Sequence, residues 1–406
     1  MSVRSKKLFR KAILSKLVKP EGKSVGLEIE SIIYTKDNKR LPVNSKKRLS
    51  AINILNSMND LVEKNGDYSL EPGGQIEWSS KPYTNLNDLN SAIKVHNNNL
   101  SKVLSENSLR EITYGVDPFY GPDEVELIKL KKYQLMDKHM GKSGTMGKWM
   151  MRCTASIQVN FDFSSYEEME EMVFIADVLH PVATYLFSNS PFQGGKKTGR
   201  KNVRSLIWEN TDNSRCNNLF DHGILSPDGL MNNYIKYICS VPGIFQLDRK
   251  KRIQKTHQNF GDRIKSLQKN SHVDIYDIEA VLHQIFTNVR IKNLVEVRGA
   301  DRTPEGYEIA PAAFWTGLLT EKNVRKEILN ISKNWTYEDR KNFNKCSQIL
   351  DRDQPAPQRK SFGEWIDIIG GLTLEGLSNR NRQESHLFKN FFEIINQKGP
   401  FGIQNQ

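Results

Sequence analysis

The sequence predicts an α+β fold in which one antiparallel sheet is packed with helices. Four stretches alternate polar and apolar residues with the period of two that puts successive side chains on opposite faces of a strand. Apolar residues at helical spacing occupy much of the remaining chain. Apart from a polar break near 351–359, nothing marks a linker. We therefore expect a single unit over 1–406, with a sheet-containing core at about 20–320 and a helical part at about 321–406.

Two segments near the N-terminus predict strands with glutamates on one face. In residues 25–32 the polar positions alternate with Leu27 and Ile29. A hairpin is expected at 68–79, because Pro72-Gly73-Gly74 is a tight-turn signal between two runs with strand character. The polar residues of these strands are Glu28, Glu30, Gln75 and Glu77, with Glu71 directly before the turn.

The other two alternating segments carry different polar groups. Residues 153–163 alternate without a break, and their polar side holds mainly hydroxyl and amide groups. Residues 289–297 alternate again, with an interruption at Asn293 and Leu294, and their polar side is mainly basic. The polar residues are Thr154, Ser156, Gln158, Asn160 and Asp162 in the first segment, and Arg290, Lys292, Glu296 and Arg298 in the second.

The remaining elements follow from helical periodicity and glycine content. A short amphipathic helix at about 9–18 leads to the first strand, and a further strand is expected at 112–116. Gly141, Gly144 and Gly147 predict a loop or a mobile lid, and 190–200 predicts a basic, mobile loop. Helices are predicted at 49–62, 86–104 and 164–187, within 230–287, and from 311 to 396.

Together the polar faces indicate a site for a metal-bound nucleotide. Carboxylate and carboxamide oxygens bind hard divalent cations, and arginine binds phosphate through two parallel hydrogen bonds. Ordinary outer faces carry lysine, threonine and long side chains of mixed charge instead. The alternative interpretation is a set of half-buried strands with a solvated outer face.

Composition limits the function classes. No run of about 18 apolar residues is present, so we expect no transmembrane helix. The basic segment 1–19 lacks the apolar core of a secretory signal, and too little chain precedes Gly26 to favour a mitochondrial presequence. Four cysteines without a CxxC pair argue against a disulfide scaffold or a zinc site and favour a cytoplasmic location. The net charge of +12 is scattered, so we expect no nucleic-acid partner.

An ordered set of motifs resembles the plant and proteobacterial type of glutamate–cysteine ligase. The motifs run from about residue 26 to residue 319 and leave the helical tail uncovered. They are Gly26-x-Glu28-x-Glu30, Leu70-Glu71-Pro72-Gly73-Gly74-Gln75-x-Glu77, Gln158-Val159-Asn160-x-Asp162-Phe163-Ser164-Ser165, Asn189-Ser190-Pro191-Phe192, Arg204-Ser205-x-x-Trp208, Thr211-Asp212-x-x-Arg215, Val289-Arg290-x-Lys292-x-x-x-Glu296-Val297-Arg298-Gly299-Ala300-Asp301 and Pro311-Ala312-x-Phe314-Trp315-x-Gly317-Leu318-Leu319.

The resemblance implies a fold similar to glutamine synthetase, in which an antiparallel sheet forms a cup around nucleotide and metal ions. It implies a single catalytic unit, a monomer or homodimer, that joins the glutamate γ-carboxylate to the cysteine amine. The implied reaction uses ATP and passes through a γ-glutamyl phosphate, as the first step of glutathione synthesis.

The resemblance also implies roles for individual residues. Mg²⁺ or Mn²⁺ would be held by Glu28, Glu30, Glu71, Glu77, Gln158 and Glu296. ATP would contact Lys292 and Arg298, and the glutamate and phosphoryl region would be lined by Arg204, Trp208, Arg215 and Arg290. Arg204, Arg290 and Arg298 would act in catalysis. A loop at 190–204 would close over the acyl phosphate to exclude water.

Three departures from the family pattern concern the amine substrate. Ile29 stands where the family usually has histidine or a similar residue, Arg200 where it has an aromatic residue, and Asp117 where plant-like members have glutamine. Three alternatives stay open: a related ligase that uses a different amine, a phosphoryl-transfer enzyme without ligation, and a basic binding protein with an inactive metal cup.

Overall fold

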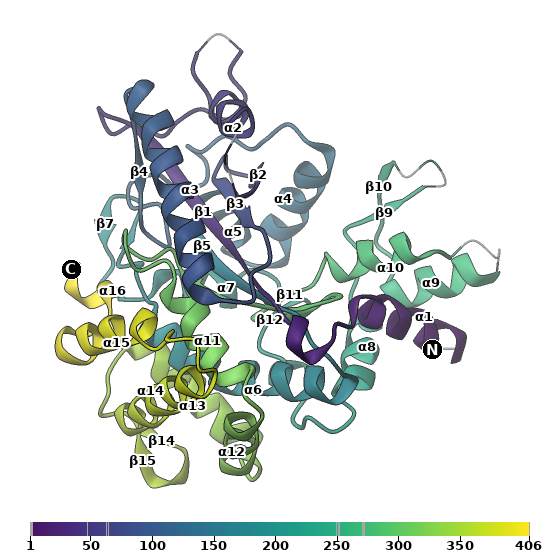
Figure 1. Cartoon of the computed structure of the whole chain (residues 1–406). Coiled ribbons are helices and arrows are strands. Elements are labelled where there is room, and N and C mark those ends of the chain that lie inside the picture. Colours follow the sequence, from purple (N-terminus) through teal and green to yellow (C-terminus); the bar gives the residue numbers. More distant parts are fainter. Residues whose placement is uncertain are drawn as a thin grey trace.

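A seven-stranded sheet with helices packed around it forms the centre of the molecule (Figure 1). The computed structural model describes residues 3–405 apart from 47, 62, 64, 249, 251 and 270–272. The strand order is β12-β13-β5-β1-β3-β2, with β4 also paired to β1, and every neighbouring pair is antiparallel. The strands are β1 (Val25–Thr35), β2 (Gly66–Leu70), β3 (Ile76–Ser80), β4 (Leu109–Ile112), β5 (Ser156–Phe161), β12 (Val289–Ile291) and β13 (Val295–Asp301). The predicted α+β class with an antiparallel sheet is confirmed.

Two strand predictions need correction. The segment 289–297 is not one strand but the hairpin β12–β13, because the chain reverses at the interruption that Asn293 and Leu294 caused in the alternation. The segment 153–163 starts its strand only at Ser156, because Cys153 ends a helix. Alternation by itself does not distinguish a continuous strand from two strands joined by a tight turn, since both preserve the period of two.

The glycine-rich segment 141–147 is largely helical rather than a lid. It joins two helices, α4 (Lys131–Ser143) and α5 (Gly147–Cys153). Gly147 is required by packing, since a Cβ there would lie 2.0 Å from the carbonyl oxygen of Met140. The strand expected at 112–116 lies earlier, at β4. Val62, which belongs to the helix predicted at 49–62, lies outside the described residues.

The other helices agree in type with the sequence pattern, except α7 and α16, which the pattern did not predict. In the first part of the chain they are α1 (Val3–Ile13), α2 (Ala51–Asn59), α3 (Leu86–Glu106), α6 (Tyr166–Leu186), α7 (Val203–Glu209), α8 (Leu230–Ser240), α9 (Phe260–Lys269) and α10 (Ile275–Leu282). The C-terminal helices are α11 (Ala310–Leu319), α12 (Lys322–Ser332), α13 (Tyr337–Ile349), α14 (Phe362–Asn379), α15 (His386–Lys398) and α16 (Phe401–Gln404). Short strands are β6 (Phe192–Gln193), β7 (Lys196–Lys197), β8 (Cys216–Asn217), β9 (Phe245–Leu247), β10 (Ile253–Lys255), β11 (Phe286–Thr287), β14 (Pro355–Ala356) and β15 (Lys360–Ser361).

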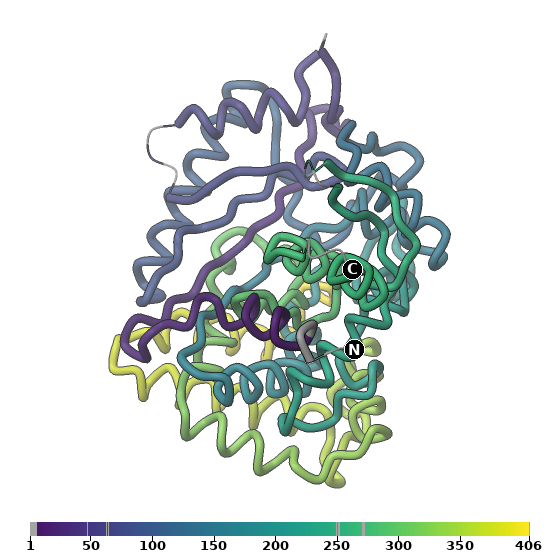
Figure 2. The backbone as a smooth tube through the Cα atoms, turned by 90° about the vertical axis from the view of Figure 1, so that its right-hand side faces the viewer, coloured from purple at the N-terminus to yellow at the C-terminus, as the bar shows by residue number. Residues whose placement is uncertain are grey.

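One face of the sheet is apolar and covered by helices. Val159 and Val297 lie opposite each other on β5 and β13 and are fully buried. They share a hydrophobic core with α6 and α11, which contact these strands. The C-terminal helices gather below the sheet in both views (Figures 1 and 2). The same core includes residues from Phe9 to Ile395, so the sheet-containing and helical parts are packed as one body, and the division at about residue 320 stays a prediction.

No helix within the described residues combines the length and the apolar character that crossing a membrane requires. This agrees with the absence of a long apolar run in the sequence.

A buried ion pair ties the C-terminal helix α13 to α6. Arg340 donates to Asp177 Oδ2, and both side chains are at most 2% exposed. Asp177 also accepts from the backbone N–H of Leu219 at 2.7 Å, so its carboxylate is fixed on both sides. Burial raises the pKa of Asp177 and lowers that of Arg340, so each charge depends on the other for compensation.

Replacing Arg340 by leucine should therefore leave a buried carboxylate without its partner and lower the free energy of unfolding by about 3 kcal/mol. Urea unfolding followed by circular dichroism measures this loss. The matched control is Lys341→Leu on the same helix, whose contact with Glu338 is exposed and 4.0 Å long, and it should change stability little. Equal effects of the two substitutions would contradict the role of the buried pair.

Candidate active site

The polar side of the sheet forms a cavity of about 250 Å³, called the carboxylate cavity below. The strand register brings its residues together: Glu30 lies opposite Glu77, and Glu28 lies opposite Gln158. Opposite residues of an antiparallel pair project from the same face. The six predicted metal-binding residues, Glu28, Glu30, Glu71, Glu77, Gln158 and Glu296, all line this cavity, together with Lys132, Arg290, Lys292 and Arg298.

Glu71 reaches the cavity from the turn between β2 and β3. The amide of Gly74 donates to the carbonyl oxygen of Glu71 at 2.9 Å, and Gly74 has a φ of 79°, which favours glycine. Burial, and then the negative charge of Glu30, raises the pKa of the Glu71 carboxyl group to about 7, against weaker positive contributions from Lys132 and Arg298. The turn thus holds a carboxylate whose charge is poorly compensated.

Glu77 has the same property. Burial, followed by the charges of Glu71, Glu28 and Glu30, raises its pKa well above the usual range. Its one recorded hydrogen bond among the described residues comes from Ser69 Oγ at 2.9 Å, which is a neutral donor. Two strands and one turn therefore concentrate negative charge that a bound cation would neutralise.

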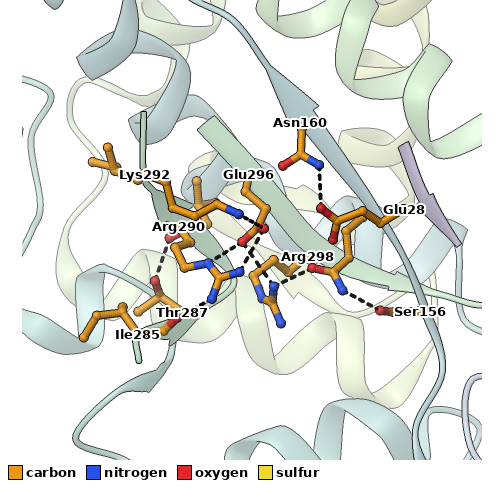
Figure 3. Close-up of polar contacts among 12 residues, drawn as sticks. Glu28, Ser156, Asn160, Ile285, Thr287, Arg290, Lys292, Glu296 and Arg298 are labelled. Carbon is orange, nitrogen blue, oxygen red and sulfur yellow. Dashed lines mark hydrogen bonds and ion pairs between the residues drawn. The ribbon is translucent and has the colours of Figure 1, made fainter. Parts of the chain in front are cut away.

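Glu296 is compensated instead by cations from its own hairpin (Figure 3). Arg290 Nη2 and Lys292 Nζ contact Oε1 at 2.9 and 2.8 Å, and Arg298 Nη1 contacts Oε2 at 3.1 Å. Burial opposes ionisation, but the charges of Arg290, Lys292 and Arg298 hold the pKa of Glu296 well below its usual range. The predicted metal ligand Glu296 thus serves in this structure as the shared partner of three basic residues.

Strand β5 lies between the acidic and basic strands and carries neutral polar groups. Asn160 Nδ2 donates to Glu28 Oε1 at 2.9 Å, and Gln158 Nε2 donates to Glu30 Oε1 at 3.1 Å. The oxygen of Gln158 accepts a hydrogen bond from Arg298. Because an amide has both a donor and an acceptor end, Gln158 joins an acidic residue to a basic one without adding charge.

A divalent cation fits the acidic half of the cavity by the chemistry of the donor set. Glu28, Glu71 and Glu77 supply hard oxygen ligands of the kind that Mg²⁺ and Mn²⁺ prefer. Within the described residues no three carboxylate, histidine or cysteine groups are arranged in ligand geometry. Glu30 is already occupied by the amide and hydroxyl of Ser156 at 2.7 and 3.0 Å. The ligand set is brought into one cavity, and its assignment stays a prediction.

A β-bulge aims Arg298 toward a second cavity. Val297 lies opposite Val159, but Ala300 lies opposite Ile157, so β13 has one extra residue at this point. Bulges of this kind redirect a side chain out of the regular alternation. Arg298 lines the carboxylate cavity, and together with Arg204 and Trp208 it also lines two further cavities of about 60 and 200 Å³. These three residues form the junction between the sheet face and the cavity of about 200 Å³.

The junction contains nitrogen donors without acceptors. Arg204 Nε, Trp208 Nε1 and Arg298 Nε are buried and have no hydrogen-bond partner among the described residues. The guanidinium carbons of Arg204 and Arg298 lie 5.8 and 5.9 Å from the ring centre of Trp208, within cation–π distance. Buried donors are normally paired, so unpaired ones next to a cavity indicate an anionic ligand such as a carboxylate or phosphate.

Arg204 and Trp208 lie on helix α7 rather than in a mobile loop. The helix begins after Asn202, whose side chain accepts from the amide of Ser205 at 3.1 Å. The residues before it form only the short hairpin β6–β7. Helix α7 therefore supplies a fixed position for both side chains.

Arg215 is the predicted site residue that the structure places away from the cavities. It is fully buried, its Nε contacts Asp212 at 2.7 Å, and its Nη1 donates to the carbonyl oxygen of Gln284 at 3.1 Å. Its contacts hold neighbouring segments together, so a direct contact with substrate is not supported by this geometry.

Several lining residues were not found from the sequence. Lys132 lies on α4, a helix that the sequence analysis did not predict. Glu209 directly follows Trp208, and this adjacency was the available signal. Asp221 and Asn344 gave no sequence signal, because they approach the cavity of about 200 Å³ from segments outside the motifs.

Comparisons with known proteins support the sequence resemblance. The sequence model of glutamate-cysteine ligase family 2 matches residues 24–348. The chloroplastic glutamate–cysteine ligase of Arabidopsis thaliana is 34% identical over 333 residues, which cover 80% of this chain and 63% of that protein. The chloroplastic glutamate–cysteine ligase A of Oryza sativa subsp. indica is 32% identical over 352 residues, covering 84% and 69%. The chain thus spans about two thirds of the length of these curated relatives.

A solved structure shares the fold. The glutamate–cysteine ligase of Francisella tularensis, crystallised in complex with AMP, superposes with a TM-score of 0.55 over 94% of this chain and 86% of that chain. The sequence identity is 12%, so this likeness concerns the fold alone. The match of the family model over most of the chain shows that the chain belongs to the glutamate-cysteine ligase family 2.

Proposed function

We propose that the protein is an ATP-dependent glutamate–cysteine ligase. It would join the γ-carboxylate of glutamate to the amine of cysteine through a γ-glutamyl phosphate, giving γ-glutamylcysteine, ADP and phosphate, the first step of glutathione synthesis. The observation that carries this proposal is the junction of Arg204, Trp208 and Arg298, whose unpaired donors lie between an acidic cavity and a second cavity of about 200 Å³. Family membership adds independent support.

The carboxylate cavity suits the nucleotide end of the reaction. Mg²⁺ or Mn²⁺ held by Glu28, Glu71 and Glu77 would neutralise phosphate charge when bound. Lys292 and Arg298 stand across from these glutamates and supply positive charge for the phosphates of ATP. The AMP in the Francisella tularensis relative is in keeping with an adenine nucleotide as substrate.

The junction suits the reacting carboxylate. Carboxylate and phosphate repel each other, so bringing them together requires donors that hold both anions in place. Arg204 and Arg298 are rigid planar donors for this purpose, and Arg290 fixes the Glu296 carboxylate against which Arg298 is positioned. The segment before α7, which contains Gly194 and Gly195 at φ values of 56° and 76°, would cover the acyl phosphate and exclude water.

We also propose a cytoplasmic location and a monomeric or homodimeric state, without a nucleic-acid or membrane partner. None of the four cysteines, all of which lie within the described residues, forms a disulfide, in keeping with a reducing compartment. The curated plant relatives are named as chloroplastic proteins, so localisation of a tagged chain in its own cells is the direct test.

The purified protein with Mg-ATP should release ADP rapidly only when glutamate and cysteine are both present. The reason is that the acyl phosphate stays bound in the site and blocks further turnover until an amine attacks it. A coupled ADP assay with a panel of amines, including 2-aminobutyrate, measures the specificity, and mass spectrometry identifies the product. A γ-glutamyl product formed with another amine but not with cysteine would replace the acceptor while preserving the ligase chemistry.

Changing Glu71 to glutamine should abolish most activity and also change the pH dependence of stability. The pKa of Glu71 is raised by folding to about 7, so the folded state binds this proton more tightly and the stability it provides is lost as pH rises from about 5 to 7. In EDTA the variant should therefore gain stability relative to wild type over this range, and Mg²⁺ should reverse the difference.

Urea unfolding at several pH values, with and without Mg²⁺, measures that difference. The matched control is Glu327→Gln, at an exposed residue of α12. Its difference in stability from wild type should be the same at every pH. A Glu71→Gln curve that runs parallel to wild type would exclude the proposed charge accumulation.

Arg298→Lys should lower kcat/KM for ATP by roughly 10²-fold, or about 2.7 kcal/mol of transition-state stabilisation. Lysine keeps the charge but loses the planar donors, including the unpaired Nε, that face the junction. Steady-state kinetics with ATP varied, together with a melting curve, tests this expectation. Arg10→Lys on the exposed side of α1 is the control, and normal turnover of Arg298→Lys would remove Arg298 from the catalytic set.

A further inference from the structure

The 200 Å³ cavity has a polar wall that the family motifs do not explain. Five asparagines line it, and we call it the asparagine pocket: Asn202, Asn217, Asn218, Asn288 and Asn344. Three carboxylates, Glu209, Asp221 and Asp301, belong to the same lining, and the three junction residues are also part of it. Asp301 is paired with Arg204 at 3.6 Å, whereas Glu209 and Asp221 have no arginine of the junction as a recorded partner among the described residues. The pocket therefore has acidic groups as well as basic ones.

Glu209 is held in place by neutral amides from the C-terminal helix α13. Gln348 Nε2 donates to Glu209 Oε1, and the side chain of Asn344 also hydrogen-bonds to Glu209. Burial, and then the charge of Asp221, raises the pKa of Glu209, while the two amides and the more weakly acting Arg200 lower it. The carboxylate is thus fixed in position, but its negative charge is not fully compensated.

The unpaired donors are nitrogens. Besides those of the junction, His180 Nε2 is buried and lacks a partner among the described residues. Its ring lies against Gly299, where a Cβ would come within 1.9 Å of Nε2. Burial, and then the charge of Arg204, lowers the pKa of His180 to about 3, so the ring is neutral. The positive charges at this part of the lining are those of Arg204 and Arg298, which also contact the carboxylates of Asp301 and Glu296.

We propose that the asparagine pocket holds the amino acid whose side-chain carboxylate is activated, with its α-ammonium group against Glu209 and Asp221. This inference rests on the proposed function and specifies which groups of the substrate are recognised. The side-chain carboxylate lies at Arg204 and Arg298, where the pocket meets the carboxylate cavity.

The arrangement of charges decides this orientation. Arg204, Trp208 and Arg298 line both the pocket and the cavity that includes Glu30 and Glu71, so a carboxylate must bind there to meet a phosphate. The remainder of the substrate then extends toward the carboxylates. A cavity of about 150 Å³ accommodates a molecule of the size of benzene, so about 200 Å³ is enough for one small amino acid.

Asn344 and Gln348 act as positioning residues. Both belong to α13, in the part of the chain that the motif resemblance left uncovered. Helix α13 is itself anchored to α6 by Arg340 and Asp177. The C-terminal part therefore takes part in substrate selection by fixing the Glu209 carboxylate.

A comparison of two substrates tests the proposal. Glutaric acid has the two carboxyl groups of glutamate but no ammonium group, so its binding does not depend on Glu209. Glu209→Gln should lower kcat/KM for glutamate by roughly 10- to 100-fold and leave the lower value for glutaric acid within about twofold, since a charged hydrogen bond is lost only with glutamate. The KM values for cysteine and ATP should not change.

Asn344→Ala should change glutamate kinetics in the same direction by a smaller factor, mainly through KM. Glu327→Gln on the exposed face of α12 is the matched control and should behave as wild type. Melting curves for all variants identify any loss of fold. An equal loss with glutamate and glutaric acid would show that Glu209 is only structural, and a change confined to the KM for cysteine would assign the pocket to the acceptor. Either result overturns the proposal.

Calorimetric titration of glutamate and glutaric acid, in the presence of a non-hydrolysable ATP analogue and Mg²⁺, separates this proposal from the proposed function. A wild type that binds glutamate through Glu209 but forms no product with any amine would contradict the ligase assignment and support the pocket assignment. A ligase that binds both acids equally well in the wild type would do the reverse.

Discussion

The architecture of the site depends on the charge imbalance across the polar face of the sheet. Strands β1 and β3 and the turn after β2 carry Glu28, Glu30, Glu71 and Glu77, while the hairpin β12–β13 carries Arg290, Lys292 and Arg298. In the strand order, β5 separates these halves and holds them with amide groups rather than charges. Like charges at short distance oppose folding unless they are compensated. The acidic half therefore keeps uncompensated negative charge, which favours a bound cation, whereas the basic half is neutralised by Glu296.

The apolar face of the same sheet makes this polar face stable. Burial of Val159 and Val297 against α6 and α11 fixes the strands, and the register then determines which side chains meet in the cavity. Since a shift by one residue would exchange the two faces, the hydrophobic core and the site are specified by the same alternation. The bulge in β13 is the exception to this regularity, and it provides Arg298 with contacts to both cavities.

In the proposed reaction, the two cavities would serve the two halves of a carboxylate activation. One contains the charges suited to a metal-bound nucleotide, and the other has the size and polarity suited to an amino acid. Arg298 lines both of these cavities, whereas Arg204 and Trp208 line the second one and the 60 Å³ cavity next to Glu30 and Glu71. In this arrangement the C-terminal helices do more than cover the sheet, because α13 fixes Glu209 at the far side of the second cavity. In that proposal, substrate specificity and stability would both depend on the packing of α13 against α6.

The sequence by itself determined the sheet, its polar face and the family, because alternation and short motifs are local properties that persist in any correct fold. It identified Glu28, Glu71, Glu77 and Arg298 as neighbours from their motifs, and the cavity contains all of them. It did not separate β12 from β13, since the alternation resumes in the same phase after the interruption at Asn293 and Leu294. It did not assign the partners of Glu296 or the buried position of Arg215, because these depend on which side chains the strand register and the packing bring within a few ångströms. Only the tertiary structure brought Glu209 together with Asn344 and Gln348. These two residues follow Glu209 by more than a hundred positions in the chain and share no sequence pattern with it.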